Sequence, residues 1–177
     1  MPAPSKIAAA RYARRARLAV RASATILLPI AVAGCAGNPP QLQEGLWDIR
    51  AQRIENPGEK HTEFAYKLCR DHAYDKAANA RIKDVKGCAT LVKDLGGGKF
   101  SSASTCTVAN VTIESNGVSV FKNGASTHSE THATYTPAFN GRTEETMTQD
   151  QQYIGKCPAG TKPGDMIYPD GLVRHHD

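Results

Sequence analysis

Three side chains able to bind a metal ion alternate along one segment of this sequence: His128, Glu130 and His132. If the segment is an extended strand, its period of two places all three side chains on one face. Two imidazoles and a carboxylate suit a borderline divalent ion such as zinc. Because no fourth ligand lies nearby in the sequence, we favour a solvated polar face and predict no metal and no cofactor. A metal-dependent activity of these three residues is the alternative.

The segment before the first cysteine, Cys35, has the pattern of an export signal. A cationic stretch, Arg11–Arg21, precedes an uncharged, mostly apolar run of 13 residues, Ala22–Gly34. This order of charge, apolar run and small residues is typical of a secretory signal peptide. The run is shorter than the ~20 residues that a membrane-spanning helix needs. The pair Arg14-Arg15 leaves the twin-arginine export route as an alternative.

The residues around Cys35 predict a lipid anchor. Val32-Ala33-Gly34-Cys35 resembles a bacterial lipobox, in which the signal is cut before a cysteine that then carries fatty acyl chains such as palmitate. Residues 1–34 are therefore expected to be a lipoprotein signal peptide, and residues 35–43 a tether between lipid and domain. Ala36 follows the cysteine instead of Asp, which favours the outer membrane and a domain facing the periplasm.

The net charge argues against nucleic-acid binding. The whole chain has 22 basic and 17 acidic residues, but six of the basic residues and none of the acidic ones precede residue 35. The remaining 16 basic and 17 acidic residues carry a formal charge of −1. A domain without a broad positive field does not hold phosphate backbones, so no nucleic-acid partner is predicted.

The other four cysteines predict two disulfides, since an even number of cysteines in a small exported domain is typical of crosslinks. Between Cys88 and Cys106, seven residues on either side flank Gly96-Gly97-Gly98. A hairpin turning at these glycines places the two cysteines directly opposite each other. By elimination, Cys69 pairs with Cys157. A zinc site is the alternative, but the sequence has no C-x-x-C spacing.

Short alternating segments separated by turn signals indicate an all-β fold. Residues 46–51 place Trp47 in a half-buried strand, and Asn123-Gly124 is the preferred reversal after a strand that Asn116-Gly117 interrupts with a bulge or a turn. Asp71 is placed to cap a short helix that ends near Asp84. We therefore expect a mainly antiparallel, curved meander or small barrel-like sheet with one helix.

The domain is predicted to span residues 44–172. Residues 173–177, which include His175 and His176, are expected to be a polar and disordered tail.

The two ends of this domain resemble a known family. The opening motif is Glu44-Gly45-Leu46-Trp47-Asp48-Ile49, and the closing motif is Ile154-Gly155-Lys156-Cys157-Pro158-Ala159-Gly160. In combination with the export signal and four later cysteines, they are similar to a proteobacterial envelope family catalogued as domain of unknown function 3617. The resemblance implies an architecture and an envelope location, but no catalytic residue.

No arrangement typical of an enzyme stands out, since there is no G-x-S-x-G and every cysteine has another predicted use. We therefore expect a non-enzymatic, lipid-anchored envelope protein that binds a partner protein or supports the envelope. The alternative is a carrier of a small apolar ligand inside the sheet. The rings that would surround this ligand are Trp47, Phe64, Tyr66, Phe100 and Phe121.

Overall fold

The computed structural model describes residues 39–83 and 85–175. The predicted signal peptide, Cys35 and the first part of the tether lie outside these residues, as do His176 and Asp177. No helix in the described part of the chain is long and apolar enough to cross a bilayer.

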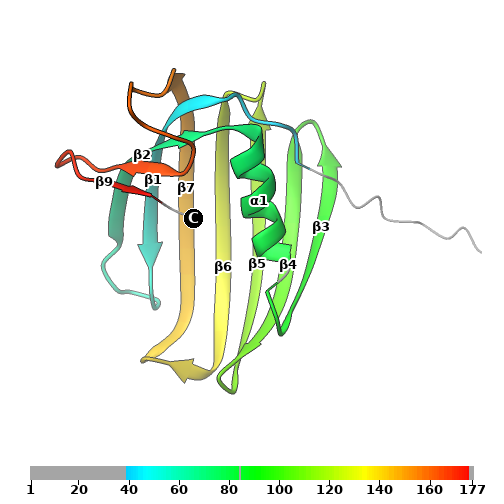
Figure 1. Cartoon of the computed structure of the whole chain (residues 1–177). Helices are drawn as coiled ribbons and strands as arrows, with labels where there is room; N and C mark the ends of the chain where they lie inside the picture. Colours follow the sequence, from blue (N-terminus) through cyan, green and yellow to red (C-terminus); the bar gives the residue numbers. More distant parts are fainter. Residues whose placement is uncertain (1–38, 84, 176–177) are drawn as a thin grey trace, which may run out of the picture. The chain divides into compact units, whose positions relative to one another are not determined.

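Nine strands and one helix make up the described part of the chain (Figure 1). In chain order they are β1 (Gly45–Ile54), β2 (Thr62–Arg70), α1 (His72–Lys83), β3 (Cys88–Gly96), β4 (Lys99–Val108), β5 (Val111–Lys122), β6 (Ser126–Phe139), β7 (Arg142–Gly155), β8 (Asp165–Ile167) and β9 (Val173–His175). All pairings are antiparallel, and the strand order in the single sheet is β3-β4-β5-β6-β7-β1-β2-β8-β9. The prediction of a mainly antiparallel sheet with one short helix is confirmed.

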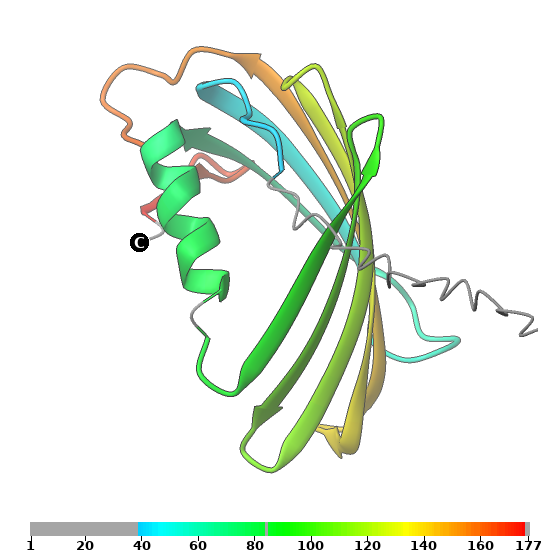
Figure 2. The same ribbon diagram turned by 90° about the vertical axis from the view of Figure 1, so that its right-hand side faces the viewer.

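The sheet is curved but open. Strands β3 and β9 are its two edges and do not pair with each other, so the curved form of the prediction is the observed one and the closed barrel is not. Figure 2 shows the helix α1 on the concave side of the sheet. Successive side chains of a strand point to opposite faces of the sheet, so Trp47 lies on the concave face and its neighbour Asp48 on the convex face.

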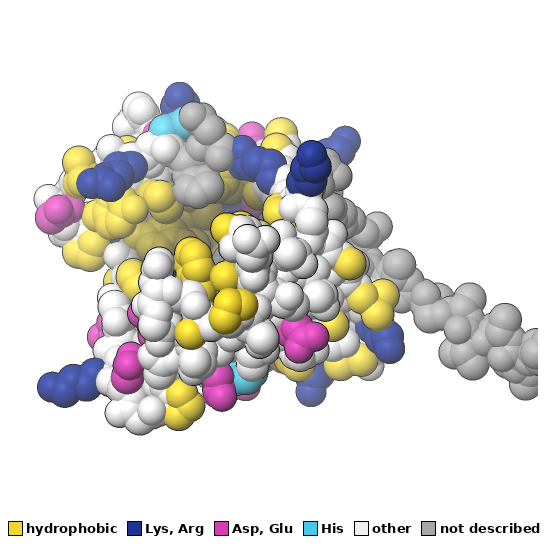
Figure 3. All heavy atoms as spheres, turned by 90° about the horizontal axis from the view of Figure 1, so that it is seen from below, with side chains coloured by type: hydrophobic (Ala, Val, Ile, Leu, Met, Phe, Trp, Pro, Cys, Tyr) yellow, Lys and Arg dark blue, Asp and Glu magenta, His cyan; other side chains and the backbone are white. Residues whose placement is uncertain are grey.

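The core lies on the concave face, over β1. Trp47, Ile49 and Ala51 alternate along β1, and each is buried, with no exposed surface on Trp47. The Trp47 indole N–H donates to the Gln43 carbonyl (2.8 Å), and its ring meets Tyr153 edge-on at 6.1 Å. The predicted core role of Trp47 is confirmed. Figure 3, seen from the end of the sheet opposite Gln43, shows hydrophobic side chains gathered in the hollow of the sheet.

The helix begins as the sequence predicts. The Asp71 carboxylate accepts a hydrogen bond from the backbone N–H of Tyr74 (2.7 Å), which satisfies a donor that the first turn leaves unpaired. Tyr74 packs against the core cluster, and Asp75 pairs with Arg70 at 2.7 Å. These contacts attach the first turn of α1 to the end of β2.

Two glycines pack closely against neighbouring strands. A side chain at Gly45 would collide with the Gly155 carbonyl on β7, which explains the glycine of the Gly-Leu-Trp motif. A Cβ at Gly117 would lie 3.0 Å from the hydroxyls of Ser102 and Thr131 on the two neighbouring strands. The strand β5 runs straight through Asn116-Gly117, so the predicted interruption there is wrong: the glycine serves packing, not a turn.

The reversals otherwise follow the predicted turn residues. The turn between β5 and β6 lies at Asn123-Gly124, and the backbone φ angles there are 51° and 66°. The turn between β3 and β4 lies at the three glycines, with Cys88 directly opposite Cys106.

Both predicted disulfides are present. Cys88 bonds to Cys106 within the β3–β4 hairpin, and Cys69 bonds to Cys157 across 88 residues of chain. The second bridge joins the buried Cys69, at the end of β2, to the loop after β7. It therefore holds the long C-terminal loop against the sheet.

The C-terminal segment differs from the prediction. Residues Val173–His175 form the strand β9, which pairs with β8, so a disordered tail beginning at residue 173 is wrong. The reason is a tertiary contact: His175 Nδ1 lies 2.8 Å from the carboxylate of Asp165, a buried residue at the start of β8.

Candidate functional site

The predicted metal residues share the convex face of β6. His128, Glu130 and His132 alternate along the strand, and their side chains are 46%, 69% and 51% exposed. The common face expected from the sequence is therefore the observed one. It is a solvated face, flanked by polar side chains of β7 on one side and by Val118 and Val120 of β5 on the other.

These three side chains do not converge on one point. His128 Nδ1 lies 2.7 Å from the Asp150 carboxylate and His128 Nε2 lies 3.3 Å from Glu130, whereas His132 lies 3.4 Å from Glu144. The hydrogen bond with Asp150 and then that with Glu130 raise the pKa of His128 above its ordinary value of 6.5. Within residues 39–83 and 85–175, no group of three His, Cys, Asp or Glu residues is arranged to hold a metal ion.

A different surface offers unused bonding groups: the outer edge of β3. The backbone N–H of Thr107 donates to the Gly87 carbonyl (2.8 Å), which identifies these two residues as a hydrogen-bonded pair. Hydrogen-bonded and non-bonded pairs alternate in an antiparallel ladder. The backbone N–H and C=O groups of Thr90, Val92 and Asp94 therefore point away from β4, towards the open edge. No described strand pairs with this edge.

Exposed apolar side chains lie beside these groups. Leu91 and Leu95 project from β3 with 53% and 52% of their surface exposed. Leu91 and Lys93 share the convex face, and Leu95 lies in the bulge after Asp94. From Leu91 a shallow groove of about 470 Å³ continues across β4 to β6, lined in part by Ala103 and Val118. The edge and the groove thus form one surface, which we call the β3 surface.

The Cys88–Cys106 bridge stiffens the β3 surface at its start. It crosslinks the edge strand to β4, and the Cα atoms of the two residues are 4.0 Å apart. Just before the bridge, Gly87 packs so closely on β4 that a Cβ there would lie 2.8 Å from the Thr107 carbonyl. An edge strand held in this way keeps its backbone groups in a fixed register for a partner.

Sequence reasoning missed the β3 surface. It located the hairpin and the disulfide, but it did not show that β3 lies at an edge or that its leucines are exposed. Edge status depends on which strands pair across the sheet, and no local pattern encodes this. The only local signal is weak: the segment 89–95 lacks the strict alternation of a strand covered on one face.

The predicted ligand-lining rings do not behave as one group. Trp47 and Phe100 are buried, and Phe100 meets Phe121 edge-on at 5.5 Å. Phe64 is 36% exposed and lies beneath the Arg53 guanidinium, 4.7 Å from its ring centre. The buried rings therefore pack against other side chains of the core.

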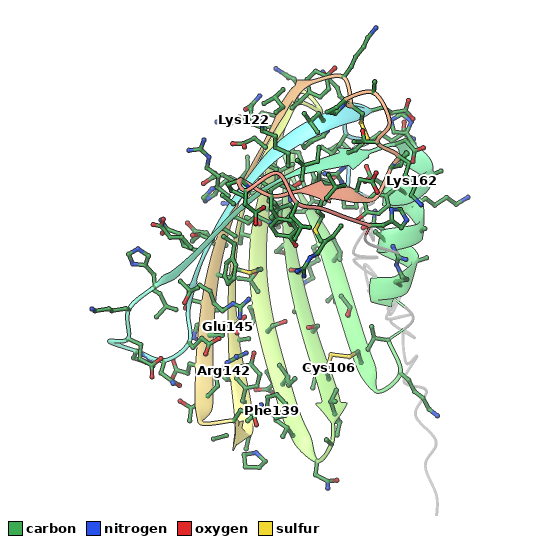
Figure 4. All side chains as sticks on the ribbon, turned by 60° about the vertical axis from the view of Figure 1, so that its left-hand side comes forward. Cys106, Lys122, Phe139, Arg142, Glu145 and Lys162 are labelled. Atoms are coloured by element: carbon green, nitrogen blue, oxygen red, sulfur yellow. A yellow bond between two sulfur atoms is a disulfide. The ribbon has the colours of Figure 1, made fainter. Side chains whose placement is uncertain are left out.

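An ion-pair cluster lies on the concave side, near the end of β1 and the start of β7. Arg142 contacts Glu145 at 2.7 Å and Glu55 at 2.8 Å, and Glu55 also contacts Arg53 at 3.2 Å. Figure 4 shows Arg142 and Glu145 next to each other, close to Phe139. Two guanidinium groups and two carboxylates balance in charge. The cluster therefore ties β1 to β7.

Comparison with known proteins places the chain in a family. The search of the curated proteins found no match. The family model described as "Protein of unknown function (DUF3617)" matches residues 42–157. The match covers the strands β1 to β7, both disulfides and the β3 surface. The chain therefore belongs to the DUF3617 family.

Proposed function

We propose that this protein is a non-enzymatic binding protein of the bacterial envelope, held to the membrane by a lipid on Cys35. Its ligand is an extended segment of a partner protein, which adds a strand to the outer edge of β3. The observation that carries the proposal is the open edge, where Thr90, Val92 and Asp94 direct their backbone groups outwards.

Strand addition fits the chemistry of this edge. A row of unpaired backbone groups binds an extended peptide through main-chain hydrogen bonds, and neighbouring side chains select its sequence. Natural edges are usually short, bulged or covered, which prevents unwanted pairing. β3 is nine residues long and has a bulge only next to its turn, after Asp94.

The side chains favour a particular kind of partner strand. On the convex face, Leu91 favours an apolar residue in the partner, and Lys93 favours an acidic residue. A segment that alternates apolar and acidic residues would satisfy both. A strand with a lysine opposite Lys93 would be disfavoured by like-charge repulsion.

The envelope location has independent support. Two disulfides are typical of a domain that folds outside the reducing cytosol. The sequence before the described domain has the order of a lipoprotein signal, ending at Cys35. Replacing Cys35 by Ser should abolish incorporation of labelled palmitate and leave the protein soluble or uncut. A Cys35→Ser protein that still carries lipid would contradict the anchor.

A substitution at Val92 tests the binding edge. Proline at this position removes the outward N–H and breaks no hydrogen bond to β4, because the N–H of Val92 does not bond to β4. A photoreactive residue at Leu91, used in intact cells, should form an adduct that Val92→Pro abolishes. The control variant Val92→Thr keeps the N–H and should preserve the adduct.

A second photoreactive position gives the specificity control. Ile154 is a similarly exposed apolar residue on β7, far from β3 in the strand order. An adduct that forms equally at Ile154, or that survives Val92→Pro, would refute strand addition at β3. An adduct with a second copy of this chain would replace the proposed partner by self-association.

One observation favours a second candidate, the carrier of a small apolar ligand. Hydrophobic side chains gather in the hollow of the sheet, which is visible from the end opposite Gln43 (Figure 3). Half-buried Tyr66, Phe121 and Met166 pack there around the core. Mass spectrometry of protein purified from membranes in its folded state should detect a stoichiometric, non-covalently bound lipid if this hollow is a binding site. Protein that carries no lipid besides its covalent acyl chains would support the partner-binding proposal.

A further inference from the structure

We infer that one end of the sheet rests on the bilayer, where four lysines contact the phosphates of anionic phospholipids. The end in question carries the Asn123-Gly124 turn, and we call it the tether end. Its lysines are Lys99, Lys122, Lys156 and Lys162. The inference rests on the proposed anchor at Cys35, and goes beyond it by stating which surface of the domain faces the lipid.

The antiparallel topology brings the four lysines to the same end. Lys99 begins β4 and Lys122 ends β5, and the two strand ends are joined by a hydrogen bond from the Phe121 N–H to the Gly98 carbonyl (2.8 Å). Lys156 directly follows the end of β7. Figure 4 shows Lys122 and Lys162 at one end of the sheet, with Phe139 at the other.

Lys162 belongs to the loop after β7, which is fastened to this end at two points. The Cys69–Cys157 disulfide is one, and a hydrogen bond from the Gly164 N–H to the Cys69 carbonyl (2.8 Å) is the other. The loop therefore presents Lys162 beside the end of β2.

The tether enters the domain at this same end. Leu42 is 8% exposed and belongs to the core, and its carbonyl lies 3.0 Å from the His72 Nε2 atom. The next residue, Gln43, donates its backbone N–H to the Gly124 carbonyl (2.8 Å). These contacts fix the chain at the tether end, so the part that leads to Cys35 starts from there.

The tether is too short for the other end of the sheet to face the membrane. From Leu42 back to Cys35 there are seven residues, which span at most about 25 Å when fully extended. The strand β6 has 14 residues and is therefore about 45 Å long. The domain therefore cannot stand on the end of β6 that carries the Asn140-Gly141 turn, with the tether end pointing away from the bilayer, while Leu42 stays in the core.

The tether end carries four exposed lysines that can contact anionic phosphates, beside four carboxylates that keep their negative charge. The four lysines are exposed, and none forms an ion pair with a carboxylate in the described part of the chain. The carboxylates at this end are engaged locally. Glu44 accepts a hydrogen bond from His72, Asp71 caps α1, Asp94 bonds to Gly96, and Asp165 contacts His175 and the Lys162 N–H. Lysines near an anionic leaflet contribute about fivefold each to membrane affinity.

Lysine labelling of the lipidated, full-length mature protein tests this placement. The protein is compared in a neutral detergent and in vesicles of phosphatidylethanolamine and phosphatidylglycerol, with an amine-reactive reagent and peptide mass spectrometry. We expect labelling of the four lysines to fall about fivefold in vesicles, the factor set by headgroup contact at each one. Lys60, between β1 and β2, and Lys86, before β3, lie at the opposite end and should not change.

Charge reversal provides a second test. In Lys99→Glu/Lys122→Glu protein on vesicles, labelling of Lys156 and Lys162 should rise towards its level in detergent. Lys60→Glu/Lys86→Glu is the matched control and should leave the pattern unchanged. Equal labelling of all lysines in vesicles and in detergent would overturn the inference.

The mass of the N-terminal peptide separates the two possible failures. A diacyl or triacyl peptide that begins at Cys35, with no protection of the four lysines, refutes the membrane-facing end alone. An N-terminal peptide without acyl chains refutes the anchor, and with it the basis of this inference.

Discussion

The Cα atoms of Cys88 and Cys106 lie 4.0 Å apart, directly across the β3–β4 pair. This short separation is that of a non-hydrogen-bonded pair, whose backbone groups point away from each other. Cys88 is therefore in the same kind of pair as Thr90 and Val92, the next two alternate residues of β3, whose backbone groups face the open edge. One geometric relationship explains both the crosslink and the exposed bonding groups of β3.

Removing this bridge should destabilise the domain and loosen its edge. The bridge closes a loop between residues 18 apart in the sequence, and a loop of that size contributes about 3 kcal/mol in the chain-entropy model. We expect Cys88→Ser/Cys106→Ser to lower the free energy of unfolding by about that amount, measured by urea denaturation. Amide exchange should also quicken along β3. No loss of stability would show that the hairpin holds its geometry without the crosslink.

Trp47 should be the most sensitive position of the core. It has no exposed surface, it bonds to Gln43, and it packs on Tyr153. Trp47→Ala should cost about 3 to 5 kcal/mol, a large part of the stability of a small domain. Circular dichroism during urea denaturation would measure the loss. Leu91→Ala, on the exposed edge, is the control and should stay within about 0.5 kcal/mol.

The hydrogen bond between His128 and Asp150 should be visible in the titration of His128. Asp150 raises the pKa of His128, and Asp150→Asn should lower that pKa towards its ordinary value. NMR titration of the His128 ring would measure the shift. An unchanged pKa would show that Asp150 does not hold the imidazolium in solution.

The same bond sets the sign of a pH effect on stability. Because the folded-state pKa of His128 is raised, its contribution is complete below the ordinary value of 6.5. That contribution is lost as the pH rises through the raised pKa. The effect should be small, because the side chain is 46% exposed and solvent screens the pair.

The contact between Asp165 and His175 should hold the C-terminal strand in place. The backbone N–H of Lys162 and then the His175 side chain lower the pKa of Asp165 below its ordinary value of 3.8. Its contribution is therefore present above this value and is lost as the pH falls through the lowered pKa. Asp165→Asn should accelerate amide exchange in β9 at neutral pH. His175→Ala removes only one of the two partners and should have a smaller effect.

Patterns that depend on near neighbours in the chain could be predicted from the sequence. The Cys88–Cys106 pair, the Asp71 cap and the Asn123-Gly124 turn each involve residues within one hairpin or one helical turn. Alternation also placed Trp47 in the core and the three metal candidates on one face. The Cys69–Cys157 pair followed by elimination once the first pair was assigned.

Only the tertiary structure decided which strands lie at the edges and what the far ends of the chain contact. The β1–β2 hairpin pairs with β7, which leaves β3 at an edge. Asp165 contacts His175, which holds β9 beside β8. It also placed Leu42 in the core beside Gly124, at one end of the sheet. These contacts join residues far apart in the sequence, so no local periodicity or turn signal encodes them. Their free energy comes from the packing of the whole sheet.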